Sequence, residues 1–101
     1  MKNASFSTYD VKSCCENENK LGINFRKGKH YVGWFIKNEK KICRITVPPG
    51  RKSIGKGLYR TMAFQLKLTT NQFDELLDCP LAKDGYEEIL REKGLINDNP
   101  K

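Results

Sequence analysis

The fold is decided by residues 23–47, which read INFRKGKHYVGWFIKNEKKICRITV. Three runs in this stretch, residues 23–26, 30–37 and 41–47, are rich in the β-branched and aromatic side chains that favour strands. Two short polar breaks, residues 27–29 and 38–40, separate them and have the length of hairpin turns. The stretch therefore predicts three consecutive strands that form an antiparallel meander.

The phase of the middle strand is ambiguous. By alternation, Val32, Trp34 and Ile36 share one face with His30, but Tyr31 and Phe35 make the opposite face apolar as well. The sequence does not indicate which face of the sheet is exposed to water.

In the sequence, helices are predicted both before and after the three strands. Val11, Cys14 and Cys15 have helical spacing, and Ser7 or Thr8 precedes them as an N-cap. A second helix is predicted after the strands, because apolar residues recur at every fourth position from residue 54 and would form a stripe on one helical face. Ser53, directly before them, is the expected N-cap of this helix. The residues of the stripe are Ile54, Leu58, Met62 and Leu66.

Two further helices are predicted near the C-terminus. Thr69 or Thr70 caps the first, which ends near residues 79–80. Asp84 and Glu87 have the spacing of a capping box, and Gly94 marks the end of the second helix. The element order predicts an α+β fold in which helices cover one face of the sheet, within one domain of 101 residues.

Charge is distributed unevenly along the chain. Lys and Arg total 19 against 12 Asp and Glu, which gives a net charge of +7. Residues 20–67 hold 13 of the basic residues and one acid, Glu39, so this block carries +12 and the rest of the chain carries −5. A basic block of this kind indicates a surface for nucleic acid, although a lysine-rich surface that merely aids solubility is the alternative.

Several classes of function are disfavoured by the sequence. No apolar run reaches the ~18–20 residues of a membrane span, and residues 1–10 lack the apolar core of a secretory signal, so we expect a cytoplasmic protein without membrane partners. No two of the four cysteines have the C-x-x-C spacing of a zinc site, and we expect them to be thiols, with no metal and no cofactor.

His30 is the only histidine, and it follows the cationic turn formed by residues 26–29. Histidine is the side chain best suited to move a proton near neutral pH, and RNA cleavage requires a base for the 2′-hydroxyl and cations for the phosphate. The alternative is that His30 is an ordinary surface or structural histidine.

Residues 51–60, RKSIGKGLYR, have the features of a phosphate clamp. A helix N-terminus attracts anions, and Gly55 and Gly57 leave room for a phosphate to approach the backbone. Lys52, Lys56 and Arg60 place cations at every fourth position on one helical face. The alternative is a solvated helix face.

The sequence resembles the HicA-like toxins of toxin–antitoxin pairs, which are small ribonucleases with a double-stranded-RNA-binding-domain-like fold. The resemblance rests on four segments, residues 27–30 (KGKH), 44–48 (RITVP), 56–61 (KGLYRT) and 69–73 (TTNQF). It covers residues 11–77, within an expected core of residues 8–78, and residues 79–101 form an acidic helical extension. The family pattern implies that His30 is the catalytic residue, that mRNA is cleaved without a metal or cofactor, and that a cognate HicB-like antitoxin binds the protein.

The leading hypothesis is therefore a ribonuclease toxin, an mRNA interferase. Lys29, Lys52 and Lys56 would hold the phosphate, and Lys27, Arg44 and Arg60 would lie along the RNA. The group that protonates the leaving oxygen is a lysine, Tyr31 or water.

Two other hypotheses remain. Lys29 replaces the small hydroxyl residue that usually precedes the family's histidine, so one alternative is a non-catalytic RNA-binding module of the same fold. Another is a structural subunit of a ribonucleoprotein. The acidic last helix, with Glu87, Glu88 and Glu92, either folds back over the basic block or is a surface helix without such a role.

Overall fold

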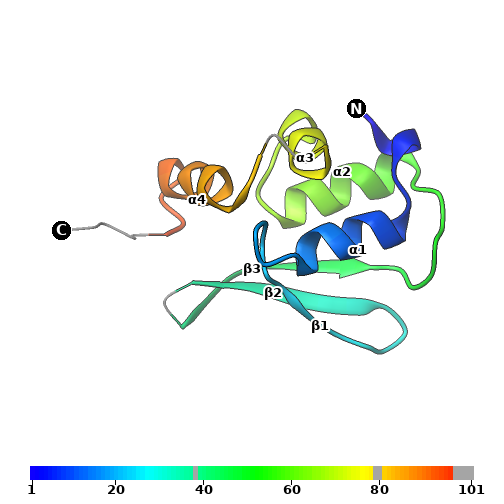
Figure 1. Cartoon of the computed structure of the whole chain (residues 1–101), viewed down its shortest axis with the longest axis horizontal. Coiled ribbons are helices and arrows are strands. Elements are labelled where there is room, and N and C mark those ends of the chain that lie inside the picture. Colours follow the sequence, from blue (N-terminus) through cyan, green and yellow to red (C-terminus); the bar gives the residue numbers. More distant parts are fainter. Residues whose placement is uncertain (38, 79–80, 97–101) are drawn as a thin grey trace.

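The computed structural model describes residues 1–37, 39–78 and 81–96, and it confirms an α+β fold with one three-stranded antiparallel sheet. A short 3-10 turn (Asn3–Ser5) precedes the main elements. These are α1 (Thr8–Glu16), β1 (Asn24–Arg26), β2 (Tyr31–Lys37), β3 (Lys40–Val47), α2 (Lys56–Gln65), α3 (Thr70–Leu77) and α4 (Lys83–Glu92). Figure 1 shows the helices over one side of the sheet, and none of the described helices lies on its other side.

The strands pair in the order β1-β2-β3, and each lies within one residue of its predicted range. Asn24 pairs with Trp34, Trp34 pairs with Arg44, and Tyr31 pairs with Val47. A bulge between Phe35 and Ile36 shifts the register near the distal hairpin.

The register resolves the ambiguous phase of β2. Phe35 is 2% exposed and faces the helices, whereas Trp34 and Ile36 are 36% and 56% exposed on the open side. Gly33 faces inward without a side chain, because a Cβ atom there would lie 2.3 Å from Cγ2 of Ile23. Tyr31 also faces the helices, with Nζ of Lys12 from α1 4.5 Å from the centre of its ring.

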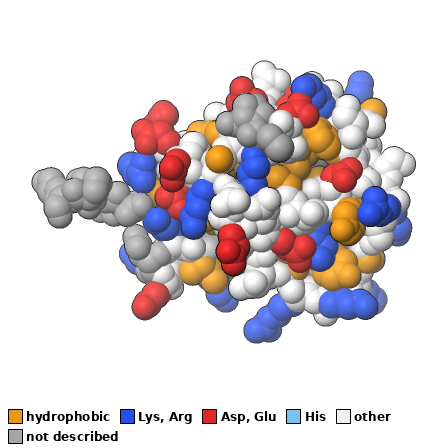
Figure 2. Space-filling view, viewed as in Figure 1, with side chains coloured by type: hydrophobic (Ala, Val, Ile, Leu, Met, Phe, Trp, Pro, Cys, Tyr) orange, Lys and Arg blue, Asp and Glu red, His pale blue; other side chains and the backbone are white. Residues whose placement is uncertain are grey.

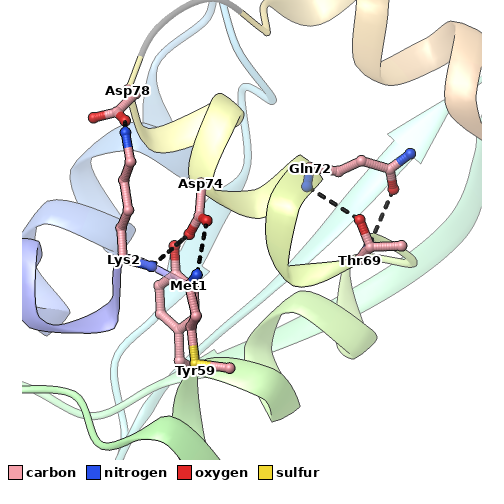
Figure 3. Close-up of polar contacts among 7 residues, drawn as sticks. All are labelled: Met1, Lys2, Tyr59, Thr69, Gln72, Asp74 and Asp78. Carbon is pink, nitrogen blue, oxygen red and sulfur yellow. Dashed lines mark hydrogen bonds and ion pairs between the residues drawn. The ribbon is translucent and has the colours of Figure 1, made fainter.

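Two predicted helix caps are confirmed. Ser7 accepts a hydrogen bond from the backbone of Asp10, whose carboxylate accepts one in return from the backbone of Ser7. Thr69 and Gln72 form the same reciprocal capping box at the start of α3 (Figure 3).

Two other predicted caps are wrong. Ser53 forms an isolated β-bridge with Ser7, so α2 begins only at Lys56, after Gly55 as N-cap. Asp84 lies inside the first turn of α4, because Ala82 is the N-cap and its carbonyl already accepts the amide of Tyr86. The amide of Lys83 donates to the carbonyl of Asn19 at 3.1 Å, so a tertiary contact accompanies the start of α4 as the Ser7 bridge does that of α2.

The last helix is part of the core. Tyr86 and Leu90 of α4 are fully buried, and the Tyr86 ring packs edge-on against Phe35 with 5.0 Å between ring centres. The Tyr86 hydroxyl donates to the carbonyl of Leu66 at 2.9 Å. Residues 79–80 and 97–101 of the predicted extension lie outside the described residues, but α4 itself is anchored to the sheet and to the end of α2.

The acidic helix α4 has a defined place relative to the basic residues 20–67. Glu87 pairs with Lys37, the last residue of β2, at 3.2 Å, and Glu88 pairs with Arg91 of the same helix. Figure 1 shows α4 at the left, at the opposite end of the molecule from the β1–β2 turn at the right. This helix therefore lies away from His30.

A buried polar cluster joins the N-terminal segment to α2 and α3 (Figure 3). The hydroxyl of the fully buried Tyr59 donates to the carboxylate of Asp74, and the backbone amide of Lys2 donates to the same carboxylate at 2.9 Å. The Met1 amino group lies 3.5 Å from it. Burial alone would raise the pKa of Asp74, but these partners together hold it below its ordinary value.

Candidate nucleic-acid interface

Two loops meet at one end of the sheet. Tyr31 begins β2 and pairs with Val47, the last residue of β3, so the β1–β2 turn and the β3–α2 loop leave the sheet at the same end. The turn carries Lys27, Lys29 and His30, and the loop carries Lys52. Figure 2 shows basic side chains along the lower right margin of the molecule, where Figure 1 places the turn.

His30 is exposed at the end of the turn, directly before β2. Its imidazole has no hydrogen-bond or ion-pair partner among the residues that the structure describes. Lys27 and Lys29, on either side of Gly28, are exposed as well. The histidine and the two lysines of the turn are thus open to a ligand from solvent.

The β3–α2 loop is held in place by the start of α1. Thr8 is the key residue, since its hydroxyl donates to the carbonyl of Gly50 at 2.7 Å and accepts the amide of Lys52 at 3.0 Å. The Thr8 amide donates in turn to the carbonyl of Lys52 at 2.9 Å. Gly50 has a φ of 84°, which favours glycine at this bend. Lys52 therefore has a fixed backbone and an exposed side chain.

The N-terminus of α2 lies open beyond this loop. No side chain caps it, and its first turn contains no acidic residue. A Cβ atom at Gly55 or Gly57 would meet no atom within 4 Å, so the backbone here is accessible on that side. Lys56 and Arg60 are exposed on successive turns of the helix. The first backbone amides of a helix, together with such cations, form a suitable site for a phosphate.

One predicted site residue lies elsewhere. Arg44 is in the middle of β3, opposite Trp34, and therefore points to the open face of the sheet and not toward α2. Its guanidinium carbon is 5.7 Å from the centre of the Trp34 ring. The structure thus places Lys27, Lys29 and His30 in the β1–β2 turn, and Lys52 in the loop that leaves the same end of the sheet. Lys56 and Arg60 lie on α2 beyond this loop, and Arg44 lies on the open face of the sheet.

Two more cations border this end. Lys12 of α1 lies over the rings of Tyr31 and Phe25, and the guanidinium carbon of Arg51 is 4.1 Å from the centre of the Tyr9 ring. The Lys12 contact has no local signal in the sequence, because it depends on how α1 packs on β1 and β2. Tyr31, a candidate proton donor, is half-buried beneath Lys12.

The other features to consider among the described residues are metal-binding clusters, reactive thiols and membrane helices. These residues contain no group of three or more His, Cys, Asp or Glu that could hold a metal ion. Cys15 and Cys43 are free thiols, and burial raises the pKa of each. The Cys14 thiol donates to the carbonyl of Leu76 at 3.5 Å, and Cys79 lies outside the described residues. Within the same part of the chain, no helix is long and apolar enough to cross a membrane.

Comparisons of the chain with protein-family models, with curated protein sequences and with solved structures found no match.

Proposed function

We propose that this chain is an RNA-binding ribonuclease of the HicA-like kind, an mRNA interferase with a double-stranded-RNA-binding-domain-like fold. The element order α1-β1-β2-β3-α2 agrees with the order in that fold. The observation that carries the proposal is the exposed His30 in the β1–β2 turn, with Lys27 and Lys29 exposed beside it and Lys52 in the loop that leaves the same end of the sheet.

The proposed reaction uses the 2′-hydroxyl of RNA as the nucleophile. His30 takes the proton from this hydroxyl as its oxygen attacks the neighbouring phosphorus, and the bond from phosphorus to the 5′-oxygen breaks. Lys29, Lys52 and Lys56 stabilise the negative charge that grows on the phosphoryl oxygens. The leaving 5′-oxygen receives a proton from a lysine, from Tyr31 or from water. The products are a 2′,3′-cyclic phosphate and a 5′-hydroxyl end.

The wider basic surface would hold the rest of the RNA. Lys27 and Arg60 would contact phosphates further along the RNA, and an antitoxin that covers the β1–β2 turn would block access to His30. Because each Lys or Arg contact with a phosphate releases counterions, binding should weaken steeply as salt increases.

The test is cleavage of a long single-stranded RNA by the purified protein in the presence of a chelator. The proposal predicts fragments with 2′,3′-cyclic phosphate ends and no cleavage of a DNA strand of the same sequence, which lacks the 2′-hydroxyl. Cleavage of both strands at equal rates, or loss of all cleavage on chelation, would contradict the proposed chemistry.

A non-catalytic RNA-binding module is the second candidate. It is favoured by the absence of any described residue that orients the His30 imidazole, since catalytic bases are commonly held by a third group. RNA binding with the same salt dependence, but without cleavage under any condition, would favour this second function.

A further inference from the structure

We infer that single-stranded RNA binds along the open face of the sheet and stacks a base on Trp34. This inference rests on the proposed function, because it names the kind of RNA that the protein takes and the surface that holds it next to the His30 end.

The open face has an apolar centre that no helix or strand of the described residues covers. Val32, Trp34 and Ile36 follow one another along β2, and the last two are 36% and 56% exposed. Together with Asn24 and Arg26 of β1, they line a depression of about 400 Å³. Exposed aromatic side chains on a sheet are a common platform for unpaired bases, since every base has a face that can stack.

The charges around this centre all have the same sign. Nζ of Lys41 is 4.8 Å from the centre of the Trp34 ring, and the guanidinium carbon of Arg44 is 5.7 Å from it. Arg26 borders the same depression, and no acidic side chain lines it within the described part of the chain. Both cations lie over the indole, so a base that stacks there takes their place on the ring. The two displaced side chains can then pair with the phosphates that flank the base.

This combination favours a single strand of RNA over the other occupants. A second copy of this chain would bring Arg26, Lys41 and Arg44 against the same three cations of its partner, which is unfavourable. An RNA duplex keeps its bases stacked inside the helix and is contacted through its minor groove and phosphates, so it would leave Trp34 without a base. The carboxylates of an acidic protein segment would pair with the cations, but they would leave the Trp34 ring without a stacking partner.

The open face is also continuous with the proposed cleavage site. β2 begins directly after His30, and Trp34 lies four residues further on, roughly 13 Å along the strand at ~3.3 Å per residue. A strand of RNA whose reacting phosphate lies at the β1–β2 turn therefore passes over Val32 and reaches Trp34. The same path explains why Arg44, which lies away from α2, belongs to a nucleic-acid surface.

The chain offers a direct probe, because Trp34 is its only tryptophan. Intrinsic fluorescence should be quenched when the full chain is titrated with a single-stranded oligoribonucleotide in a chelating buffer, and added salt should reverse the quenching. A hairpin duplex of equal length should quench much less. A polyglutamate of similar charge is the probe for an acidic protein segment.

Variants separate this surface from the His30 end. Trp34→Ala should weaken binding of the single strand by roughly 5- to 150-fold, the range of a lost base stack, while Trp34→Phe keeps most of the affinity. Arg44→Ala should also weaken binding, and Lys83→Ala, an exposed cation on α4, is the matched control without an effect. Circular dichroism checks that each variant is folded.

The outcomes distinguish this inference from the proposed function. RNA that is bound and cleaved without any change in Trp34 fluorescence, with Trp34→Ala as tight as the unaltered chain, overturns the inference and leaves the ribonuclease in place. Quenching by single strands without cleavage supports the inference and overturns the ribonuclease. Equal quenching by the duplex, or by polyglutamate, overturns the single-strand assignment in favour of a duplex or of an acidic protein partner.

Discussion

The buried hydrogen bond from Tyr59 to Asp74 gives a sharp test of how the N-terminal segment, α2 and α3 are held together. Replacing Tyr59 by Phe removes one hydroxyl that donates to a carboxylate and leaves the ring in the core, where Tyr59 is fully buried and packs against Phe73 at 4.7 Å between ring centres. A hydrogen bond to a charged group contributes about 1.5–3 kcal/mol. For a domain of this size that corresponds to a drop in Tm of roughly 6–24 °C.

The stability lost in Tyr59→Phe should also depend on pH, because the hydroxyl acts on the Asp74 carboxylate. Since the folded protein lowers the pKa of Asp74, its carboxylate stabilises the fold above the ordinary aspartate pKa, and this stabilisation is lost as the pH falls through the lowered value. The Tyr59 hydroxyl contributes to that lowering. The difference in the free energy of unfolding between Tyr59→Phe and the unaltered chain should therefore be largest at neutral pH, and it should shrink in acid below pH ~4.

The assay is urea unfolding followed by circular dichroism from neutral pH down to acid. Tyr9→Phe is the matched control, because Tyr9 is 46% exposed and its substitution should change stability by less than about 0.5 kcal/mol. Equal stability of Tyr59→Phe and the unaltered chain, or a difference that does not vary with pH, would refute the role assigned to this cluster.

The other predictions concern packing and RNA binding. Gly33→Ala should destabilise the fold by about 1–3 kcal/mol in urea unfolding, because its Cβ would lie 2.3 Å from Ile23; an unchanged midpoint would contradict the packing of β1 on β2. Gly57→Ala, where a Cβ meets nothing, should stabilise the fold slightly yet weaken RNA binding in a filter assay, and unweakened binding would argue against a phosphate at the start of α2. Truncation after Leu81 removes the fully buried Tyr86 and Leu90 and should cost about 3–6 kcal/mol, so a truncated chain as stable as the full one would show that α4 is dispensable. Lys52→Ala should reduce the slope of log affinity against log salt by about 0.7 for a single strand, whereas Lys83→Ala leaves it unchanged; equal slopes for both variants would exclude a phosphate contact at Lys52.

The strands were predictable because their signals are local. Aromatic and β-branched runs separated by short polar breaks define β1, β2 and β3, and the reciprocal capping pairs at Ser7 and Thr69 are complete within four residues of sequence. The helix starts at Ser53 and Asp84 were mispredicted because tertiary contacts decide them. Ser53 is held in a bridge with Ser7, which is 46 residues away in the sequence.

The candidate site was predictable only in part. Sequence order alone put His30 next to Lys27 and Lys29, and the meander topology brings the loop that carries Lys52 to the same end of the sheet. The side of the sheet that Arg44 occupies depends on the phase of β2, and that phase is set by which face the helices cover. Alternation could not reveal this, because both faces of β2 are apolar.

The role of His30 is tested most directly by the single-turnover rate of RNA cleavage for the unaltered chain and for His30→Ala, with RNA affinity measured in parallel. General acid–base catalysis by one side chain contributes roughly 10²–10⁴-fold, so we predict a loss of that size in the cleavage rate while the affinity changes little. Cleavage by His30→Ala at the rate of the unaltered chain would contradict the account.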